Sequence, residues 1–156
     1  MNLRAAVPAD AEAIVTIWHS GWLDGHLGHV PDAVLPYRTL DAFRERVPLR
    51  LAEITVAELD GTVAGFVLVH DDEVEQIYVA AGARGSGIAT ALLAHGEQVI
   101  AESFDVAWLS VVAGNARARR FYARSGWTDA GPFDYEAYTA DGRMILPCHR
   151  YEIRVR

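Results

Sequence analysis

The sequence is poor in cysteine and has no long apolar run. Its 156 residues include a single cysteine, so an intrachain disulfide bond is excluded. No uninterrupted apolar stretch approaches the roughly 20 residues that a membrane-spanning helix needs, and the first residues lack the basic and then apolar pattern of a secretory signal. We therefore expect a cytoplasmic protein without a membrane partner.

Basic side chains are also scarce. Lysine and arginine together number 14 against 21 acidic residues, which gives a formal net charge of −7. Affinity for nucleic acid comes largely from basic side chains that neutralise phosphates, so we expect no nucleic-acid partner. A net negative charge is compatible with a cationic substrate such as an amine, although bulk acidity mostly reports on solubility.

The rest of the composition is that of an ordinary globular protein. Hydrophobic residues make up 51% and charged residues 22% of the chain. A chain of this length can bury a sizeable core, so we expect one domain over residues 1–156. Cys148 lies beside His149 in a late β-rich segment, and we expect it to be a small buried apolar residue rather than a nucleophile.

Residues 73–90 have the sequence EVEQIYVAAGARGSGIAT, an apolar strand followed by a glycine-rich turn and a helix start. The unpaired amides and the dipole of a helix start can hold an anionic diphosphate. Gly85 and Gly87 allow close approach because they lack a Cβ, and Arg84 adds a cation. The stretch lacks the Lys-Ser or Lys-Thr pair of a P-loop and the last Gly or Ala of a dinucleotide fingerprint.

Arg84, Gly87 and Ala89 instead fill the pattern Arg/Gln-x-x-Gly-x-Gly/Ala, and the segment resembles the acyl-coenzyme A loop of the GCN5-related N-acetyltransferases. Ala81 stands where that family more often has proline. A second block matches the family's N-x-x-A-x-x-F-Y-x-x-x-G-aromatic segment with Asn115, Ala118, Phe121, Tyr122, Gly126 and Trp127. Together the two matching blocks span residues 73–127, whereas the first 70 residues resemble the family only loosely.

Periodicity and turn signals predict an α/β fold. Asp60-Gly61 between two β-rich runs predicts a tight hairpin, and Asp10 is a typical N-cap residue for the helix that follows it. Residues 21–36 are rich in glycine and proline, so we expect a bent connection there. The expected strands are 2–7, 53–59, 62–70, 73–80, 105–112, 127–138 and 143–155, and the expected helices are 11–22, 40–51, 86–101 and 115–125.

The strand–helix–strand unit over residues 73–112 should contain a parallel strand pair with a crossover helix. In the resembled family, a V-shaped opening between the corresponding strands receives the pantetheine arm of the coenzyme. The resemblance therefore implies a single-domain fold with a mixed, mostly antiparallel central sheet of about seven strands, flanked by about four helices. A splayed parallel pair would hold the coenzyme.

The resemblance also implies an N-acetyltransferase that uses acetyl-coenzyme A as cosubstrate and needs no metal. The strand backbone that ends at Val79 would hold the pantetheine arm and polarise the thioester carbonyl. Arg117, Arg120 and Arg124 are expected to form a solvated helix face, from which one could reach a coenzyme phosphate. The expected coenzyme-binding residues are Ile77, Tyr78, Val79, Arg84, Gly85, Ser86, Gly87, Ile88, Ala89, Thr90 and Asn115.

Tyr122 is the candidate general acid. It lies two helical turns after Asn115, so both side chains can face one cleft. A phenol has an ordinary pKa near 10, so it is protonated at neutral pH and can donate to a departing thiolate.

Glu75 is the first candidate for the general base, and Glu73 is the second. Their spacing of two puts both carboxylates on one face of a regular strand, where either could take a proton from an ammonium group directly or through water. The alternative is a pair of exposed charges on an edge strand. Ser110 occupies another place where some relatives carry the base, and a serine cannot do that work.

The segment after the first helix overhangs the acceptor side of the cleft in the resembled family. By this analogy we expect substrate contacts from Trp22, His26 and His29. A metal at the two histidines would need further ligands, and none is apparent. The acceptor stays open between a small primary amine, an amino-acid derivative and a peptide or protein N-terminus, and the length of the acyl group is also open.

Two other functions are compatible with the motifs. One is a catalytically silent sensor or interaction module that binds acyl-coenzyme A, and the other is a nucleotide-binding protein unrelated to acyl transfer. Intact Asn115 and Tyr122 argue against the sensor. The late β-hairpin at a sheet edge offers a possible homodimer surface.

Overall fold

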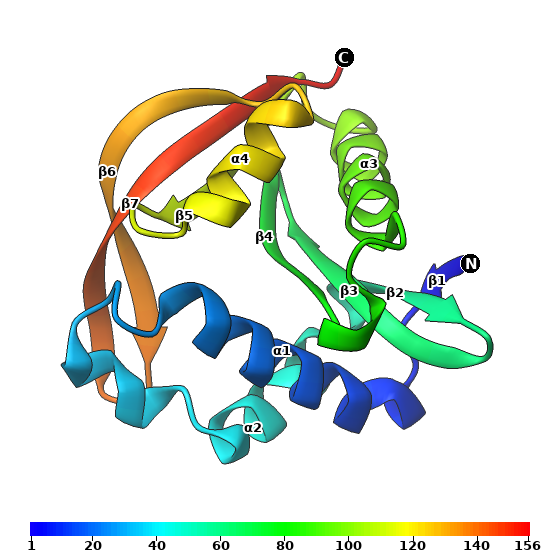
Figure 1. Ribbon diagram of the computed structural model, residues 1–156, viewed down its shortest axis with the longest axis horizontal. Helices are drawn as coiled ribbons and strands as arrows, with labels where there is room; N and C mark the ends of the chain where they lie inside the picture. Colours follow the sequence, from blue (N-terminus) through cyan, green and yellow to red (C-terminus); the bar gives the residue numbers. More distant parts are fainter.

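The computed structural model describes residues 1–156 and contains one seven-stranded sheet (Figure 1). The strand order is β1-β2-β3-β4-β5-β7-β6, which leaves β6 at one edge, where the expected homodimer surface would lie. None of the helices is both long and apolar enough to cross a membrane. The strands are β1 (Asn2–Ala5), β2 (Ile54–Leu59), β3 (Thr62–His70), β4 (Glu73–Val79), β5 (Val106–Val112), β6 (Thr128–Thr139) and β7 (Gly142–Arg154); the helices are α1 (Ala11–His26), α2 (Leu40–Arg50), α3 (Ile88–Ala101) and α4 (Ala116–Arg124), with short 3₁₀ segments η1 (Pro8–Asp10), η2 (Asp32–Tyr37), η3 (Leu51–Glu53) and η4 (Ala81–Ala83).

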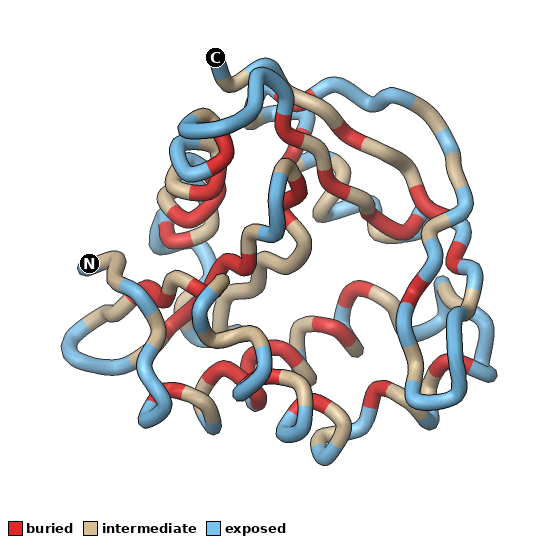
Figure 2. The backbone as a smooth tube through the Cα atoms, turned by 180° about the vertical axis from the view of Figure 1, so that it is seen from behind, coloured by how far each residue is buried: buried red, intermediate tan, exposed pale blue.

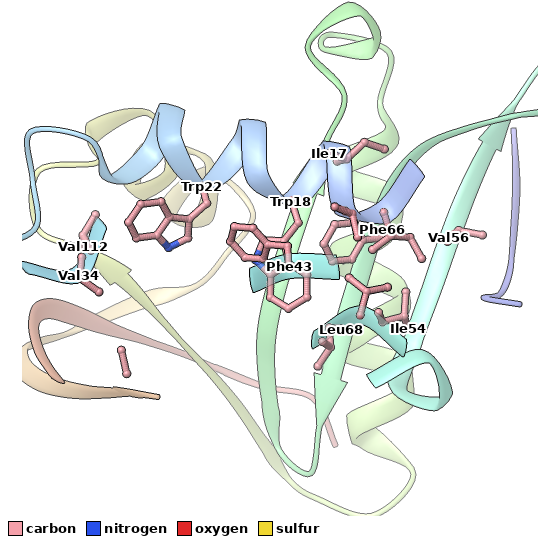
Figure 3. Close-up of a cluster of buried hydrophobic side chains, with 14 of the residues drawn as sticks. Ile17, Trp18, Trp22, Val34, Phe43, Ile54, Val56, Phe66, Leu68 and Val112 are labelled. Carbon is pink, nitrogen blue, oxygen red and sulfur yellow. The ribbon is translucent and has the colours of Figure 1, made fainter. Parts of the chain in front are cut away.

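Two hydrophobic clusters form the core, one on each face of the sheet. Successive residues of a strand point to opposite faces, so Val56 packs against α1 and α2 whereas its neighbour Ala57 packs on the α3 side. On the first face, the Trp18 ring centroid lies 5.1 Å from that of Phe43 and 5.6 Å from that of Phe66 (Figure 3). Figure 2 shows buried stretches along the sheet and along the inner sides of the helices.

The predicted hairpin between β2 and β3 is confirmed. Leu59 pairs with Thr62, and the two turn residues Asp60 and Gly61 have φ values of 54° and 76°. Positive φ at both central positions is the geometry that matches the twist of the flanking strands, and Asp-Gly is a favoured pair for it.

The predicted parallel pair is also confirmed, and it is splayed. β4 and β5 share a single register pair, Glu73 with Trp108, although both strands continue for several residues beyond it. Over the same length β4 stays paired with β3, and β5 stays paired with β7. The β5-facing edge of β4 up to Val79 is therefore left without strand partners.

The bent connection predicted from residue 21 is wrong in its first part, because α1 continues to His26. Gly21 and Gly25 serve close approach rather than a turn. A Cβ added at Gly21 would overlap the Tyr78 ring, and one at Gly25 would lie 2.8 Å from Asn115 Nδ2. These glycines let α1 lie directly against β4 and the start of α4.

Asp10 occupies the predicted N-cap position, since α1 begins at the next residue. Its side chain, however, makes no capping hydrogen bond to the helix. Its carboxylate instead accepts hydrogen bonds from Arg4 Nη1 at 2.7 Å and Nη2 at 2.9 Å, and from the amide of Val7 at 2.8 Å. The Arg4 guanidinium lowers the pKa of this carboxyl group, and the ion pair ties β1 to the start of α1.

Candidate active site

A cavity of about 450 Å³ follows the opening between β4 and β5, a size within the usual range for ligand pockets. It extends from the turn before α3 to the space between α1, α2 and the β6–β7 hairpin. Three expected site residues, Glu73, Ser86 and His29, lie outside its lining. The expected site residues that line it are Trp22, His26, Glu75, Ile77, Tyr78, Val79, Arg84, Gly85, Gly87, Ile88, Ala89, Thr90, Asn115 and Tyr122.

At one end of the cavity, six consecutive amides have no hydrogen-bond acceptor within the protein. They belong to residues 85–90, and no side chain caps the start of α3. Gly85 and Gly87 have φ values of 78° and 85°, and a Cβ on either would extend into open space. Left-handed φ favours glycine at both positions. The free amides and the α3 dipole together make an anion site.

Three arginine side chains line the cavity together with these amides. Arg84 Nη2 donates to Asp24 Oδ2 at 2.7 Å, which ties the loop to α1. Arg117 and Arg124 line the cavity without any hydrogen-bond partner, so the helix face expected to be solvated supplies two cations to the cavity. The Ser86 hydroxyl donates to the carbonyl of Ala83 and thereby stabilises the loop itself.

Tyr122 is buried among aromatic rings and its hydroxyl reaches the cavity. The ring centroids of Phe121, Trp127 and Tyr151 lie 5.4, 6.4 and 5.9 Å away. The Tyr122 hydroxyl has no hydrogen-bond partner in the protein. Every fully buried side-chain oxygen and nitrogen does have a hydrogen-bond partner, so the Tyr122 oxygen is not fully buried and borders the cavity. Burial raises the pKa of Tyr122, which keeps the phenol protonated at neutral pH.

Asn115 holds the start of α4. Its Oδ1 accepts a hydrogen bond from the amide of Ala118 at 3.2 Å, the geometry of an N-cap. Its Nδ2 faces Gly25 on α1, and the residue also lines the cavity. Asn115 therefore fixes the helix that carries Tyr122.

Glu75 lines the cavity and is held by an arginine. Arg50 Nη1 donates to Glu75 Oε1 at 3.2 Å, and Nη2 donates to the second oxygen. Arg50 Nε also donates to Glu53 at 2.9 Å, so the guanidinium bridges two carboxylates. Glu75 is thus a charge fixed in the cavity wall rather than an exposed group on an edge strand.

Glu73 is buried, and it is close enough to Glu75 for the charge of Glu75 to act on it. Its residue is 9% exposed, and burial together with the neighbouring charge of Glu75 raises its pKa to about 7. Tyr135, which lines the cavity, donates from its hydroxyl to Glu73 Oε2 at 3.4 Å. Tyr135 therefore connects this buried carboxyl group to the cavity.

Of the expected acceptor contacts, Trp22 and His26 lie at the end of the cavity away from the anion site, and His29 lies outside the cavity. Trp22 is buried and stacks on His26 with ring centroids 4.5 Å apart. His26 Nδ1 donates to the carbonyl of Trp22 at 2.8 Å, and burial lowers the pKa of His26 to about 4, so the ring is neutral at pH 7. His29 is exposed, lies against Gly114 and does not line the cavity.

Sequence reasoning missed two arginines at this end. Arg38 is 7% exposed, and its Nη1 and Nη2 donate to the carbonyls of Tyr37 at 3.1 Å and Tyr138 at 2.9 Å. Arg46 lies over the Trp18 ring, with Cζ 5.1 Å from the centroid. The apolar stripe of α2 consists of Leu40, Phe43 and Val47. Arg46 lies beside this stripe, and nothing in the sequence indicated that its guanidinium enters the cavity.

Cys148 is buried as expected and also lines the cavity. Burial raises the pKa of its thiol to about 11, so it is not ionised at neutral pH. No group of three or more histidine, cysteine, aspartate or glutamate side chains lies close enough to hold a metal ion.

Comparison with known proteins places this geometry in context. A family model described as "Acetyltransferase (GNAT) family" matches residues 14–127. An uncharacterized N-acetyltransferase of Mycobacterium bovis is 34% identical over 83 residues, which cover 47% of this chain and 51% of that protein. The chain thus spans about half the length of the curated relatives it matches.

Solved structures share the whole fold. The ribosomal-protein-alanine N-acetyltransferase from Brucella melitensis has a TM-score of 0.73 at 23% identity, with 99% of each chain covered. yncA, a putative acetyltransferase from Salmonella typhimurium whose structure contains its cofactor acetyl-CoA, has a TM-score of 0.72 at 20% identity, with 100% of this chain and 94% of that chain covered.

Proposed function

Because this chain belongs to the GNAT family of acetyltransferases, we propose that it moves the acetyl group of acetyl-coenzyme A directly to a primary amine. The acceptor is a small molecule or the N-terminus of a peptide or protein. One observation supports this most: a single cavity joins an anion site of six free amides to the hydroxyl of Tyr122 and the carboxylate of Glu75.

In this proposal the turn before α3 holds the diphosphate of the coenzyme. The amides of residues 85–90 donate to it, and Arg117 and Arg124 balance further phosphate charge. The unpaired edge of β4 at residues 77–79 offers main-chain donors and acceptors to an extended arm. Acetyl-coenzyme A supplies the acetyl group as a thioester, whose carbon–sulfur bond is the one that breaks.

Two carboxyl groups prepare the amine. Glu75, which lines the cavity, faces the ammonium group of the acceptor. Glu73 takes up the proton that this group must lose, by way of the Tyr135 hydroxyl, because a pKa near 7 lets a carboxylate accept a proton at neutral pH. The uncharged nitrogen then forms its bond to the acetyl carbon.

Tyr122 protonates the departing sulfur. Its phenol proton goes to the thiolate as the carbon–sulfur bond breaks, and its oxygen then receives the second proton of the acceptor nitrogen, which leaves a neutral amide, a free thiol and a regenerated phenol. No activated nucleophile is needed, because the amine attacks directly.

The experiment is a screen of amines with acetyl-coenzyme A in which free thiol is measured. We expect thiol release that depends on both the protein and an amine, and a measurable affinity for acetyl-coenzyme A by calorimetry. Binding without release for any amine would favour the silent sensor, and competition by ATP alone would favour a nucleotide-binding protein. Absence of binding to acetyl-coenzyme A would overturn the proposal.

A further inference from the structure

The acceptor end of the cavity carries two arginines that form no ion pair with a carboxylate. Arg46 makes no hydrogen bond to any protein group, although its side chain lines the cavity. Arg38 is buried, and both of its hydrogen bonds go to main-chain carbonyls rather than to a carboxylate. Burial lowers the pKa of Arg38 to about 10, which still leaves it charged at neutral pH. Arg38 is buried and Arg46 is half-buried, and the charge of Glu75 acts on Arg46 without an ion pair. Buried charges normally have a paired counter-charge, so both guanidinium groups are free to take an anion.

The two guanidinium groups lie along one wall. Arg46 lies over Trp18 with Cζ 5.1 Å from the ring centroid, and Arg38 lies over Trp22 at 5.9 Å. These tryptophans are four residues apart on α1, and one turn of helix rises by about 5.4 Å. Both guanidinium groups line the same cavity, and the charge of Arg46 contributes to the lowered pKa of Arg38, so the two cations are neighbours.

The local charge is opposite to that of the whole chain. Glu75 is the acidic residue in this part of the cavity wall, and it is already paired with Arg50. His26 is neutral at pH 7. This part of the cavity is therefore positively charged, although the chain has a net charge of −7. The net charge alone would predict that the protein attracts cations.

Resting on the proposed function, we infer that the acceptor is a free amino acid, whose carboxylate binds Arg46 and Arg38 while its ammonium group faces Glu75. Planar guanidinium groups match a carboxylate in geometry as well as in charge. A protein or peptide N-terminus carries a neutral peptide group in place of that carboxylate and would leave both arginines unpaired. The inference thus selects the small zwitterion among possible amine acceptors.

The test is thiol release with a panel of the proteinogenic amino acids, each beside its primary amide. The amide keeps the side chain and the amine but removes the negative charge, and its amine loses a proton more easily. We nevertheless expect the best amino acid to exceed its amide in kcat/KM by at least ~30-fold, the size of a charge-assisted hydrogen bond. The difference should lie mainly in KM.

Variants of α2 provide the control. Arg46→Gln should remove most of the preference for the acid while leaving the affinity for acetyl-coenzyme A unchanged by calorimetry. Arg46→Lys, which keeps the charge without the planar group, should retain part of the preference for the acid over the amide. Arg44→Gln changes an exposed arginine of the same helix, paired with Glu12 and Asp41, and should behave as wild type.

The outcomes separate this inference from the function on which it rests. Three outcomes would each overturn the inference and leave the coenzyme site intact. The first is that amides are acetylated as well as the acids, and the second is that Arg46→Gln lowers the turnover of acids and amides equally. The third is that acetyl-coenzyme A binds but no amino acid is turned over. Failure to bind acetyl-coenzyme A would instead overturn the proposed function, and the inference with it.

Discussion

Tyr122 and Glu73 are both buried, and burial raises the pKa of each, the direction that the proposed acyl transfer requires. The pKa of the Tyr122 phenol is raised, so it keeps the proton that a thiolate needs. The pKa of Glu73 is raised to about 7, with Glu75 adding to the effect of burial. One site thereby holds a donor that stays protonated and an acceptor poised near neutral pH, which is a recurrent division between acid and base.

We predict that Tyr122→Phe lowers kcat by about 100-fold or more, the lower range of general acid catalysis. The ring remains packed against Trp127 and Tyr151, so the affinity for acetyl-coenzyme A by calorimetry should stay close to wild type. Tyr37→Phe is the control, because Tyr37 does not line the cavity and its hydroxyl donates to Asp141. Unchanged turnover of the Tyr122 variant would reject its assignment as the acid.

For Glu73→Gln we predict the loss of a pH dependence. A base acts when deprotonated, so wild-type kcat/KM should rise with pH with a midpoint near 7, and the glutamine variant should lack this rise. Glu75→Gln should instead raise KM and shift the midpoint to lower pH, because the charge of Glu75 contributes to the raised pKa of Glu73. A normal midpoint in the Glu73 variant would show that the amine loses its proton elsewhere.

The same variant gives a readout without substrate. The folded pKa of Glu73 lies above its ordinary value of 4.5, so the folded state binds more protons and the stability from Glu73 falls as pH rises from about 4.5 to about 7. Glu73→Gln should remove up to about 3 kcal/mol of this loss, measured as the difference in urea unfolding between variant and wild type across that window. Parallel curves would contradict the raised pKa.

At the scale of elements, the turn before α3 depends on its backbone conformation. Gly87 is the N-cap of α3 with a φ of 85°, and left-handed φ costs other residues about 1–2 kcal/mol. We predict that Gly87→Ala lowers the affinity for acetyl-coenzyme A about tenfold, because the strained turn must reorient its amides. Gly82→Ala is the matched control, since Gly82 has ordinary φ and open space around it. Equal calorimetric affinities for the two variants would contradict this role of the turn.

The position of α1 against β4 gives a second prediction at this scale. Gly21→Ala places a Cβ in the Tyr78 ring, so we expect a loss of unfolding free energy of about 1–2 kcal/mol in urea despite the better helix propensity of alanine. Ser20→Ala, on the exposed side of the same helix, should be neutral or slightly stabilising. A more stable Gly21 variant would show that Tyr78 can move away at no cost.

At the scale of the whole molecule, the cavity separates the part built on β1–β4 from the part built on β5–β7. The two parts of the sheet share one register pair, Glu73 with Trp108, and α1 bridges the opening near Asn115. A ligand that fills the opening contacts both parts and adds its binding energy to the folded state alone.

We therefore predict that acetyl-coenzyme A at 100 times its Kd stabilises the chain by about 2.7 kcal/mol. That corresponds to a rise in Tm of roughly 5–10 °C for a protein of this size, measured by thermal unfolding followed by circular dichroism. ATP at the same concentration should give a smaller rise, because it has no pantetheine arm to lie along β4. An equal rise with ATP would favour a nucleotide site.

The sequence alone determined the features that local residues encode. Two β-rich runs joined by Asp-Gly predicted the β2–β3 hairpin, and the spacing of Arg84, Gly87 and Ala89 identified the turn before α3. Both are set by φ, ψ and side-chain direction within a few residues, so short patterns suffice to predict them.

Only the tertiary structure decided the burial and charge partners of the site. The sequence predicted Gly21 and Gly25 as turn residues, whereas in the fold they lie in a helix against Tyr78 and Asn115. The pairing of Glu75 with Arg50 joins β4 to α2. Arg46 lies beside the apolar stripe of α2, and only the fold decided that its guanidinium enters the cavity. These properties depend on groups far apart in the chain, because desolvation and Coulomb energies are set by what surrounds a side chain in space and not by its neighbours in sequence.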